Sequence, residues 1–123
     1  MKHWVAKQAI KTARKSRYPV FKHGAVFEKS GCIFVHGKNV KKSITPSASM
    51  SVHAEIAGLK NLLSKTRLKS GVSFNLYVAR VNPRNQVVLS KPCDKCMKAL
   101  KESGIVETIY YSTDSGKWDK CYV

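Results

Sequence analysis

Two short stretches decide the fold of this chain: VHAEIAGL at positions 52–59 and KPCDKCMKAL at positions 91–100. The first places His53 at the start of an expected helix, after a polar loop. The second starts a helix with a proline, which is favourable because proline has no N–H to leave unsatisfied at a first helical position. Cys93 and Cys96 then share the first turn of that helix on one face. The question is whether these three side chains meet around one metal ion.

The Cys-x-x-Cys pair is suited to zinc, because the free N–H groups and the dipole of a helix N-terminus lower thiol pKa values. Taken alone, the same pair is equally compatible with a redox dithiol or with two buried thiols. A lone histidine such as His53 is more often a helix cap or a core residue than a ligand. If all three side chains bind one metal, the fourth position stays open for water, as in catalytic zinc sites.

Glu55 lies two residues after His53, so its carboxylate can approach that open position. A carboxylate beside metal-activated water can take its proton and return it to a leaving group. The alternative is that Glu55 only favours the helix N-terminus electrostatically. Acidic residues are scarce before position 100, where only Glu28, Glu55 and Asp94 occur, and this scarcity favours a functional role.

The rest of the sequence predicts a layered α/β domain with a mixed sheet, covering residues 1–123 without an internal repeat. The expected elements are a helix at 3–16, hairpin strands at 25–28 and 32–36, a loop at 39–51, a helix at 53–65, a strand at 73–81, a short extension at 87–90, a helix at 92–103, a strand at 105–112 and a final short strand at 117–123. Gly104 is expected to cap the last helix.

The charge of the chain is extreme for its 123 residues. There are 23 Lys and Arg against 7 Asp and Glu, a formal net charge of +16. Such a surface attracts polyanions, which favours a phosphate-bearing partner over lysines that only keep the protein in solution.

No run of about 18 apolar residues occurs, and the basic N-terminus has no apolar stretch of a secretory signal. We therefore expect no membrane partner and an intracellular location, cytoplasmic or nuclear. A disulfide framework does not fit that location. Cys32, in an apolar run, is expected to be a small core residue, and Cys121 has no predicted role.

HAE at 53–55 and PCDKC at 92–96 match the H-x-E…P-C-x-x-C signature of zinc deaminases. The chain resembles the cytidine deaminase superfamily over about residues 20–112. FKHGAVFEKSGCIFVHGKNV at 21–40 is similar to the family's first hairpin, and GIVETIYYS at 104–112 is similar to the strand after its PCxxC helix. The resemblance implies a cytidine-deaminase-like three-layer α/β/α fold with a central mixed five-stranded sheet.

The resemblance also implies residue roles. His53, Cys93 and Cys96 would bind Zn²⁺, and Glu55 would move protons during hydrolysis of cytosine to uracil and ammonia. The backbone N–H of Ala54 would hold the pyrimidine O2, and a backbone carbonyl just before Cys93 would accept from the amino group. By similarity, Asn39 would contact the base or sugar, and Phe21 would pack near the base.

The expected substrate is a nucleotide or a single-stranded nucleic acid rather than a nucleoside. Free-nucleoside deaminases have Asn-Val-Glu where this chain has NVKK at 39–42, and Lys41 is able to donate to a phosphate but not to accept from a ribose hydroxyl. Tyr110 and Tyr111 are candidates for a stacking surface at the pocket rim. Equally, one of them is core and the other surface.

Several alternatives remain open at this stage. Adenosine-type tRNA deaminases share HAE and PCxxC, so adenine is an alternative base. A basic nucleic-acid-binding or virion structural protein built on a deaminase fold would also explain the charge, since fold does not fix function. Compact basic versions resemble deaminase-like proteins of large viruses and phages, which adds a virion-associated location. A redox protein would leave His53 and Glu55 unexplained, and a homo-oligomer is compatible with the sequence.

Overall fold

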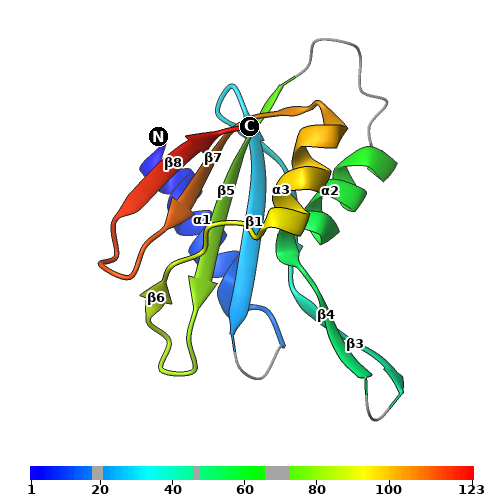
Figure 1. The fold of residues 1–123 in the computed structure, drawn as a ribbon. Helices are drawn as coiled ribbons and strands as arrows, with labels where there is room; N and C mark the ends of the chain where they lie inside the picture. Colours follow the sequence, from blue (N-terminus) through cyan, green and yellow to red (C-terminus); the bar gives the residue numbers. More distant parts are fainter. Residues whose placement is uncertain (18–20, 46–47, 66–72) are drawn as a thin grey trace.

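A mixed sheet forms the centre of the molecule, with helices on both of its faces (Figure 1). The computed structural model describes residues 1–17, 21–45, 48–65 and 73–123, and only the backbone of 40–45, 48–52 and 65. The helices are α1 (His3–Arg14), α2 (Ala54–Lys65) and α3 (Asp94–Ser103). The strands are β1 (Lys22–Lys29), β2 (Cys32–Lys38), β3 (Val40–Thr45), β4 (Ala48–Val52), β5 (Phe74–Val81), β6 (Val87–Val88), β7 (Val106–Ser112) and β8 (Trp118–Tyr122).

Five strands of the sheet follow the order β2-β1-β5-β7-β8, and the short β6 pairs with the end of β5. Only β5 and β7 are parallel, and α3 lies in the connection between them, as parallel strands require. Helix α1 lies behind the sheet, whereas α2 and α3 lie in front of it (Figure 1). The predicted three-layer α/β/α fold with a mixed sheet is confirmed, with β6 as an addition.

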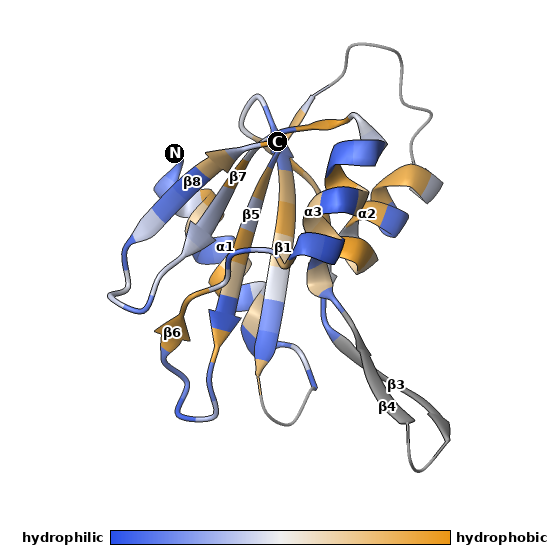
Figure 2. Ribbon diagram, viewed as in Figure 1, coloured by the Kyte–Doolittle hydropathy of each residue, from blue (hydrophilic) through white to orange (hydrophobic). Residues whose placement is uncertain are grey.

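Alternation along the central strands assigns each side chain to one of two cores. Leu76 and Val78 of β5 face α2 and α3, whereas Tyr77 and Ala79 face α1. The middle of β5 is accordingly apolar throughout, as expected for a strand buried on both faces (Figure 2). Arg80 continues the row of Leu76 and Val78, so it lies on the same face as α2 and α3.

Two glycines allow the helices to approach the sheet closely. A Cβ on Gly24 would collide with the backbone of α1 at Ala9 and Ala13. A Cβ on Gly37 would collide with the carbonyl oxygen of Ala54 and lie 2.5 Å from the nitrogen of Gly58. Backbone atoms cannot move aside as a flexible side chain does, so both contacts require glycine. The first turn of α2 is thereby held against β2.

Three expectations from the sequence were wrong. The segment 39–51 is not a loop, because β3 and β4 pair as an antiparallel hairpin that extends away from the sheet (Figure 1). The loop was predicted from its serines and its proline, but the segment also contains β-branched residues, which favour strands. Cys32 is exposed at the start of an edge strand, not a core residue. Helix α3 begins at Asp94 with Cys93 as its N-cap, so Pro92 precedes the helix.

Gly104 caps α3 in the left-handed conformation, with φ 68°, as predicted. Over the described ranges, no helix has the length and apolar character needed to cross a membrane.

The N-terminus of α1 is fixed by a buried carboxyl. Glu28 of β1 is fully buried and accepts from the Nζ of Lys2 at 2.9 Å and from the Nδ2 of Asn75 at 3.4 Å. Burial alone would raise the pKa of Glu28, but the Lys2 hydrogen bond and charge, with the Asn75 and Gly31 hydrogen bonds, hold that pKa below its ordinary value. The backbone N–H of Lys2 also donates to the Tyr77 hydroxyl at 2.9 Å.

We expect Lys2→Ala to lower the free energy of unfolding at pH 7, because it leaves the buried Glu28 carboxylate short of its charged partner. A lowered folded-state pKa stabilises the protein above the unfolded pKa of about 4.3, and this contribution is lost as the pH falls through the folded value. The difference between wild type and variant should therefore shrink on acidification. Urea denaturation at pH 7 and below pH 4 measures it, with the exposed Lys7→Ala as control. A difference that grows towards acid pH would contradict this account.

Candidate active site

Two of the predicted metal ligands occupy equivalent positions in front of the two helices on one face of the sheet. His53 immediately precedes α2, and its carbonyl accepts from the Ala57 N–H at 3.0 Å. Cys93 is the N-cap of α3, and its carbonyl accepts from the Met97 N–H at 2.9 Å. Cys93 has an extended backbone and its side chain makes no capping hydrogen bond, so the helix does not hold its thiol. Both side chains can therefore reach the space between the helices.

His53, Cys93 and Cys96 meet there. Their ligand atoms all lie within 4.8 Å of one another. The Nδ1 of His53 is 3.1 Å from the Cys96 Sγ and 3.7 Å from the Cys93 Sγ. Tetrahedral zinc with bonds of about 2.0–2.3 Å separates such ligands by about 3.5 Å, so the donor set and its spacing fit zinc. In the described part of the chain this is the one cluster of three or more possible metal ligands.

Glu55 lies beside this cluster in the first turn of α2 and is only 4% exposed. Burial raises the pKa of Glu55, and its contacts with Cys96 and His53 oppose the rise only in part. Burial and the Glu55 carboxyl in turn raise the pKa of the Cys96 thiol. A cation at the three ligand atoms would favour the thiolate, since metal binding requires it. The structure therefore places a general acid–base candidate next to a metal-binding cluster.

A hydroxyl network holds the segment that leads into α3. The Oγ of Ser90 donates to the Val78 carbonyl at 2.7 Å and accepts from the backbone N–H of Ser112 at 2.8 Å. The backbone N–H of Ser90 donates to the Ser112 carbonyl at 3.0 Å. These bonds tie the chain to Val78 within β5 and to Ser112 at the end of β7, only three residues before Cys93. The thiols are thus positioned from the sheet as well as from α3.

A cavity of about 250 Å³ opens beside the three candidate zinc ligands. Residues from four parts of the chain line it: His23, His53, Glu55, Arg80, Ser90, Lys91 and Cys93. Glu55 is the one carboxyl among them. The cavity therefore contains one candidate proton-transfer group, Glu55, and its other lining residues are polar or basic.

Arg80 and His23 lie opposite each other on paired strands β5 and β1. The Arg80 guanidinium lies over the Phe21 ring, 3.7 Å from its centroid, and its buried Nε has no hydrogen-bond partner within the described structure. Burial, with the nearby charges of Arg80 and His53, lowers the pKa of His23 to about 4. His23 is thus a neutral imidazole at pH 7, whereas Arg80 is a cation.

The structure places Asn39 and Phe21 beside the cavity rather than in its wall. Asn39 is 2% exposed, and its Oδ1 accepts from the Ser16 hydroxyl at 2.6 Å and from the His23 N–H at 2.8 Å. Its Nδ2 donates to the Phe21 carbonyl at 2.8 Å. Asn39 therefore holds the backbone that carries Phe21 and His23. Phe21 itself lines an adjoining cavity that also contains Arg80.

The remaining predicted substrate contacts have different outcomes. Ala54 is the first residue of α2, so its N–H has no acceptor within the helix and is available to a ligand. Tyr111 is 8% exposed within the core under α2 and α3 and does not line the cavity, so the predicted stacking surface is wrong for this residue. Tyr110 stacks on Tyr77 instead, with ring centroids 4.8 Å apart. The Lys41 side chain lies outside the described residues.

Arg80, His23 and Lys91 line the cavity but were not among the residues predicted from the sequence. Arg80 had a detectable signal, because residues 74, 76, 78 and 80 alternate onto one face of the strand. A basic residue at the end of such an apolar row indicates a polar site at that end of the sheet. His23 and Lys91 carried no comparable signal, since they enter the cavity through strand pairing and through the Ser90 network.

We expect the purified protein to bind one zinc ion per chain, and Cys93→Ala or Cys96→Ala to lose most of it, because two remaining ligands do not form a stable site. Elemental analysis after expression in zinc-containing medium measures this. Cys32→Ala is the matched control, since Cys32 is an exposed cysteine outside the cluster. Full zinc content in both site variants would show that the metal, if bound, lies elsewhere.

Comparisons with known proteins agree with this geometry. The family described as "Cytidine and deoxycytidylate deaminase zinc-binding region" matches residues 1–112. No curated protein sequence matches the chain. Among solved structures, cytidine deaminase from Burkholderia pseudomallei is similar with a TM-score of 0.73 and 22% identity, over 99% of this chain and 93% of that one.

The dCMP deaminase of cyanophage S-TIM5 has a TM-score of 0.58 and 22% identity, over 92% of this chain and 86% of that one. Cytidine deaminase from Mycobacterium tuberculosis has a TM-score of 0.58 and 24% identity, over 89% and 85%. At such identities these structures establish the shared fold, while the family match covers most of the chain. The chain belongs to the cytidine and deoxycytidylate deaminase family.

Proposed function

We propose that this protein is a zinc-dependent hydrolytic deaminase that converts cytosine to uracil in a nucleotide or in single-stranded nucleic acid. The proposal rests above all on Glu55, a buried carboxyl in the same cavity as His53 and Cys93. A zinc site that only stabilised the fold would have no use for a carboxyl there. Family membership supports cytosine as the base, and a phage relative is a dCMP deaminase solved in complex with dCMP and dUMP.

In this mechanism His53, Cys93 and Cys96 would hold the zinc, which would lower the pKa of water towards neutrality when bound. Glu55 accepts a proton from the attacking water and delivers a proton to the departing amine. The C4–O bond forms as the C4=N3 double bond opens and N3 takes up one proton of the water. The exocyclic C4–N bond then breaks as a C4=O double bond forms, and ammonia leaves with the second proton of the water. The N–H of Ala54 donates to the pyrimidine O2 and orients the ring.

A phosphate on the substrate is supported by the basic wall of the cavity. Arg80 and Lys91 line it, and neither is in an ion pair with any residue in the described ranges. The ring of Phe21 fixes the orientation of the Arg80 guanidinium, which reduces the entropy lost when it binds an anion. Arginine binds phosphate through two parallel N–H donors. These two residues would favour a nucleotide over a nucleoside.

The direct test measures ammonia release from dCMP, cytidine, adenosine and cytosine-bearing single strands of DNA and RNA. We expect turnover of phosphate-bearing cytosine substrates by wild type. Glu55→Gln should lower kcat by at least about 10²–10⁴-fold while zinc content and melting temperature stay unchanged, because an amide cannot transfer the proton. Glu102→Gln, at an exposed glutamate of α3, is the control. Near-wild-type turnover by Glu55→Gln would make Glu55 a structural residue and refute the mechanism.

Arg80→Gln tests the preference for phosphate. We expect kcat/KM on dCMP to fall by about 10–100-fold, as for the loss of a hydrogen bond to a charged group. The value on cytidine should change little, since cytidine has no phosphate to lose. Steady-state kinetics on both substrates measure the ratio, with the exposed Arg14→Gln as control. Equal losses on the two substrates would mean that Arg80 supports the cavity and not the phosphate.

A further inference from the structure

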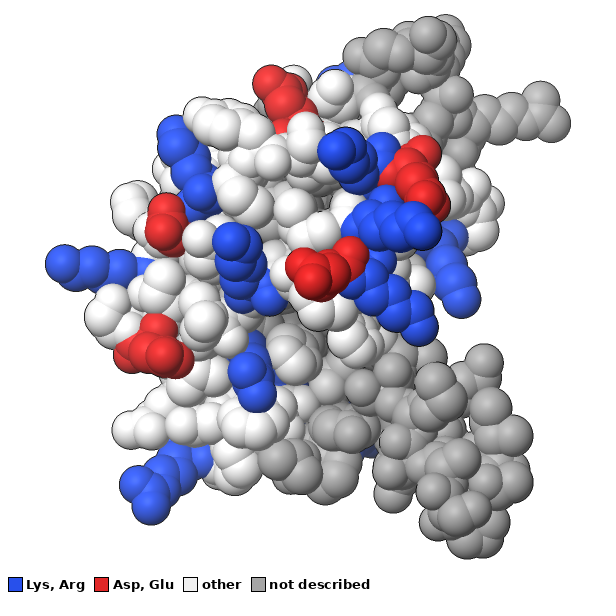
Figure 3. All heavy atoms as spheres, viewed as in Figure 1, with Lys and Arg blue, Asp and Glu red and all other residues white. Residues whose placement is uncertain are grey.

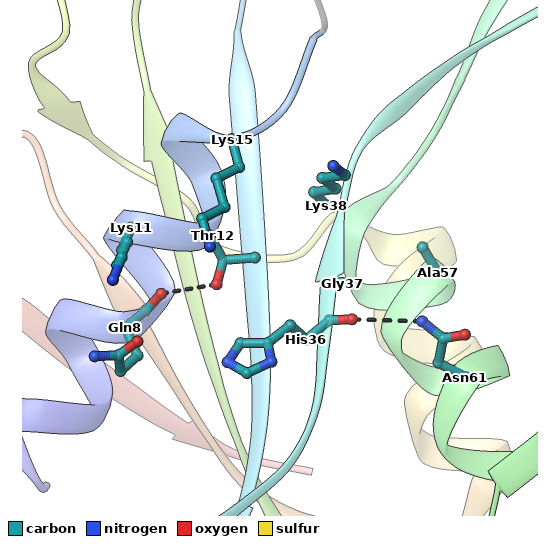
Figure 4. Close-up of a pocket in the computed structure, with 9 residues that line it drawn as sticks. All are labelled: Gln8, Lys11, Thr12, Lys15, His36, Gly37, Lys38, Ala57 and Asn61. Atoms are coloured by element: carbon teal, nitrogen blue, oxygen red, sulfur yellow. Dashed lines mark hydrogen bonds between the residues drawn. The ribbon is translucent and has the colours of Figure 1, made fainter.

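A second pocket, of about 400 Å³, lies at the outer edge of the sheet, where α1 and α2 flank β2 (Figure 4). Helix α1 contributes Lys11 and Lys15, and β2 contributes His36 and Lys38. Asn61 of α2 closes the other side, and its Nδ2 donates to the His36 carbonyl at 3.5 Å. None of these residues lines the cavity beside the three candidate zinc ligands. The pocket is therefore separate from the candidate active site.

The packing of the two helices creates this pocket. Gly24 brings α1 onto one face of the sheet, and Gly37 brings α2 onto the other face. The glycines lie on adjacent strands only one register position apart, since Gly37 pairs with Ala25. Strand β2 is the last strand of the sheet, so its far side is open to solvent between the helices. The pocket is thus a fixed part of the fold.

The charge of this pocket has one sign. Lys11, Lys15 and Lys38 line it, and no carboxyl does. The two ion pairs found among the described side chains join Lys2 to Glu28 and Lys98 to Glu102, so none of these three lysines is in one. Three uncompensated ammonium groups around one pocket attract an anion.

The surface around the pocket is also basic, because the exposed acidic residues of the chain lie elsewhere. Residues 1–93 contain 18 of the 23 Lys and Arg but only two of the seven acidic residues, Glu28 and Glu55. Both of these carboxyls are buried, at 0% and 4% exposure. Every exposed carboxyl therefore comes from residues 94–123, that is, from α3, β7, β8 and their connections. Figure 3 shows acidic side chains on the face that carries these elements. The surface formed by α1, β2 and α2 contributes no exposed carboxyl.

We propose that this pocket, formed by Lys11, Lys15, Lys38, His36 and Asn61, binds the phosphodiester backbone of a single nucleic-acid strand whose cytosine enters the active site. The inference rests on the proposed function and narrows its substrate from nucleotides to strands. Lys11 and Lys15 follow each other along α1, one turn or about 6 Å apart. Such a row suits successive phosphates of a strand better than one phosphate group.

A hydrogen-bonded link connects this pocket to the active site. Lys15 adjoins Ser16, whose hydroxyl donates to the Oδ1 of Asn39 at 2.6 Å, and Lys38 adjoins Asn39 itself. The same Oδ1 accepts from the N–H of His23, a residue that lines the catalytic cavity. Backbone phosphates held by Lys15 and Lys38 would therefore be bound next to Ser16 and Asn39, the buried residues that position one wall of the active site.

Salt-dependent binding tests the proposal independently of catalysis. The probe is a fluorescently labelled single strand without cytosine, as DNA and as RNA, titrated with wild-type protein at several salt concentrations. For Lys11→Ala/Lys15→Ala/Lys38→Ala we expect the slope of log K against log salt to become shallower by about 2, at about 0.7 per lost phosphate contact on a single strand. The matched control is Lys101→Ala/Lys117→Ala/Lys120→Ala, which removes the same charge from exposed positions among residues 94–123.

Kinetics then connect the pocket to the reaction. We expect the pocket variant to have a KM raised at least tenfold on a cytosine-bearing strand and an unchanged kcat/KM on dCMP. An unchanged salt slope, or an equal change in the control variant, would overturn the proposal. Loss of binding to a free nucleoside triphosphate with strand binding intact would also overturn it. Absence of deamination by wild type would refute the proposed function instead, because the binding experiment does not depend on turnover.

Discussion

The contact between Gly37 of β2 and the first turn of α2 is the constraint on which the site depends. A side chain on Gly37 would meet the backbone of Ala54 and Gly58 directly, so the helix can lie this close to the strand only above a glycine. His53 and Glu55 flank Ala54 in sequence. Their height above the sheet is therefore set by backbone contact rather than by packing of flexible side chains. The distances from the His53 ring to the two thiols are therefore fixed by the backbone, as a metal site requires.

A second set of constraints is polar and acts at the same level of the sheet, where Gly37, Ala25 and Val78 lie in one register row. Asn39 joins α1, through Ser16, to the backbone of His23, and Ser90 joins the start of α3 to β5 and β7. Buried hydrogen bonds of this kind contribute modest net stability but penalise every arrangement that leaves them unmade. They fix loops for which apolar packing alone gives no unique position. The site is consequently held on both sides, by helices packed on glycine and by loops tied to the sheet.

Local patterns predicted most of the fold and the chemical centre of the site. The apolar spacing of α1 and α3, the strand at 74–81 and the His-x-Glu and Cys-x-x-Cys motifs each carry their information within a few residues. Arg80 was detectable from the alternation along β5, but His23 and Lys91 could not be found in that way, because strand register and the Ser90 network bring them to the cavity. Tyr111 and Cys32 were misplaced for a related reason. Which side of a strand faces a core, and which strand is an edge, depends on neighbours distant in sequence.

The separation of charge along the chain has a consequence for motion in solution. Because the exposed carboxyls all belong to the last 30 residues, the molecule has an electric dipole in addition to its net charge. A polyanion would exert a torque on it as well as an attraction, within about the 8 Å over which physiological salt screens charges. The molecule would turn during approach and present the surface of α1 and β2 first. Encounters would begin in a restricted set of orientations, which raises the share of collisions that lead to binding.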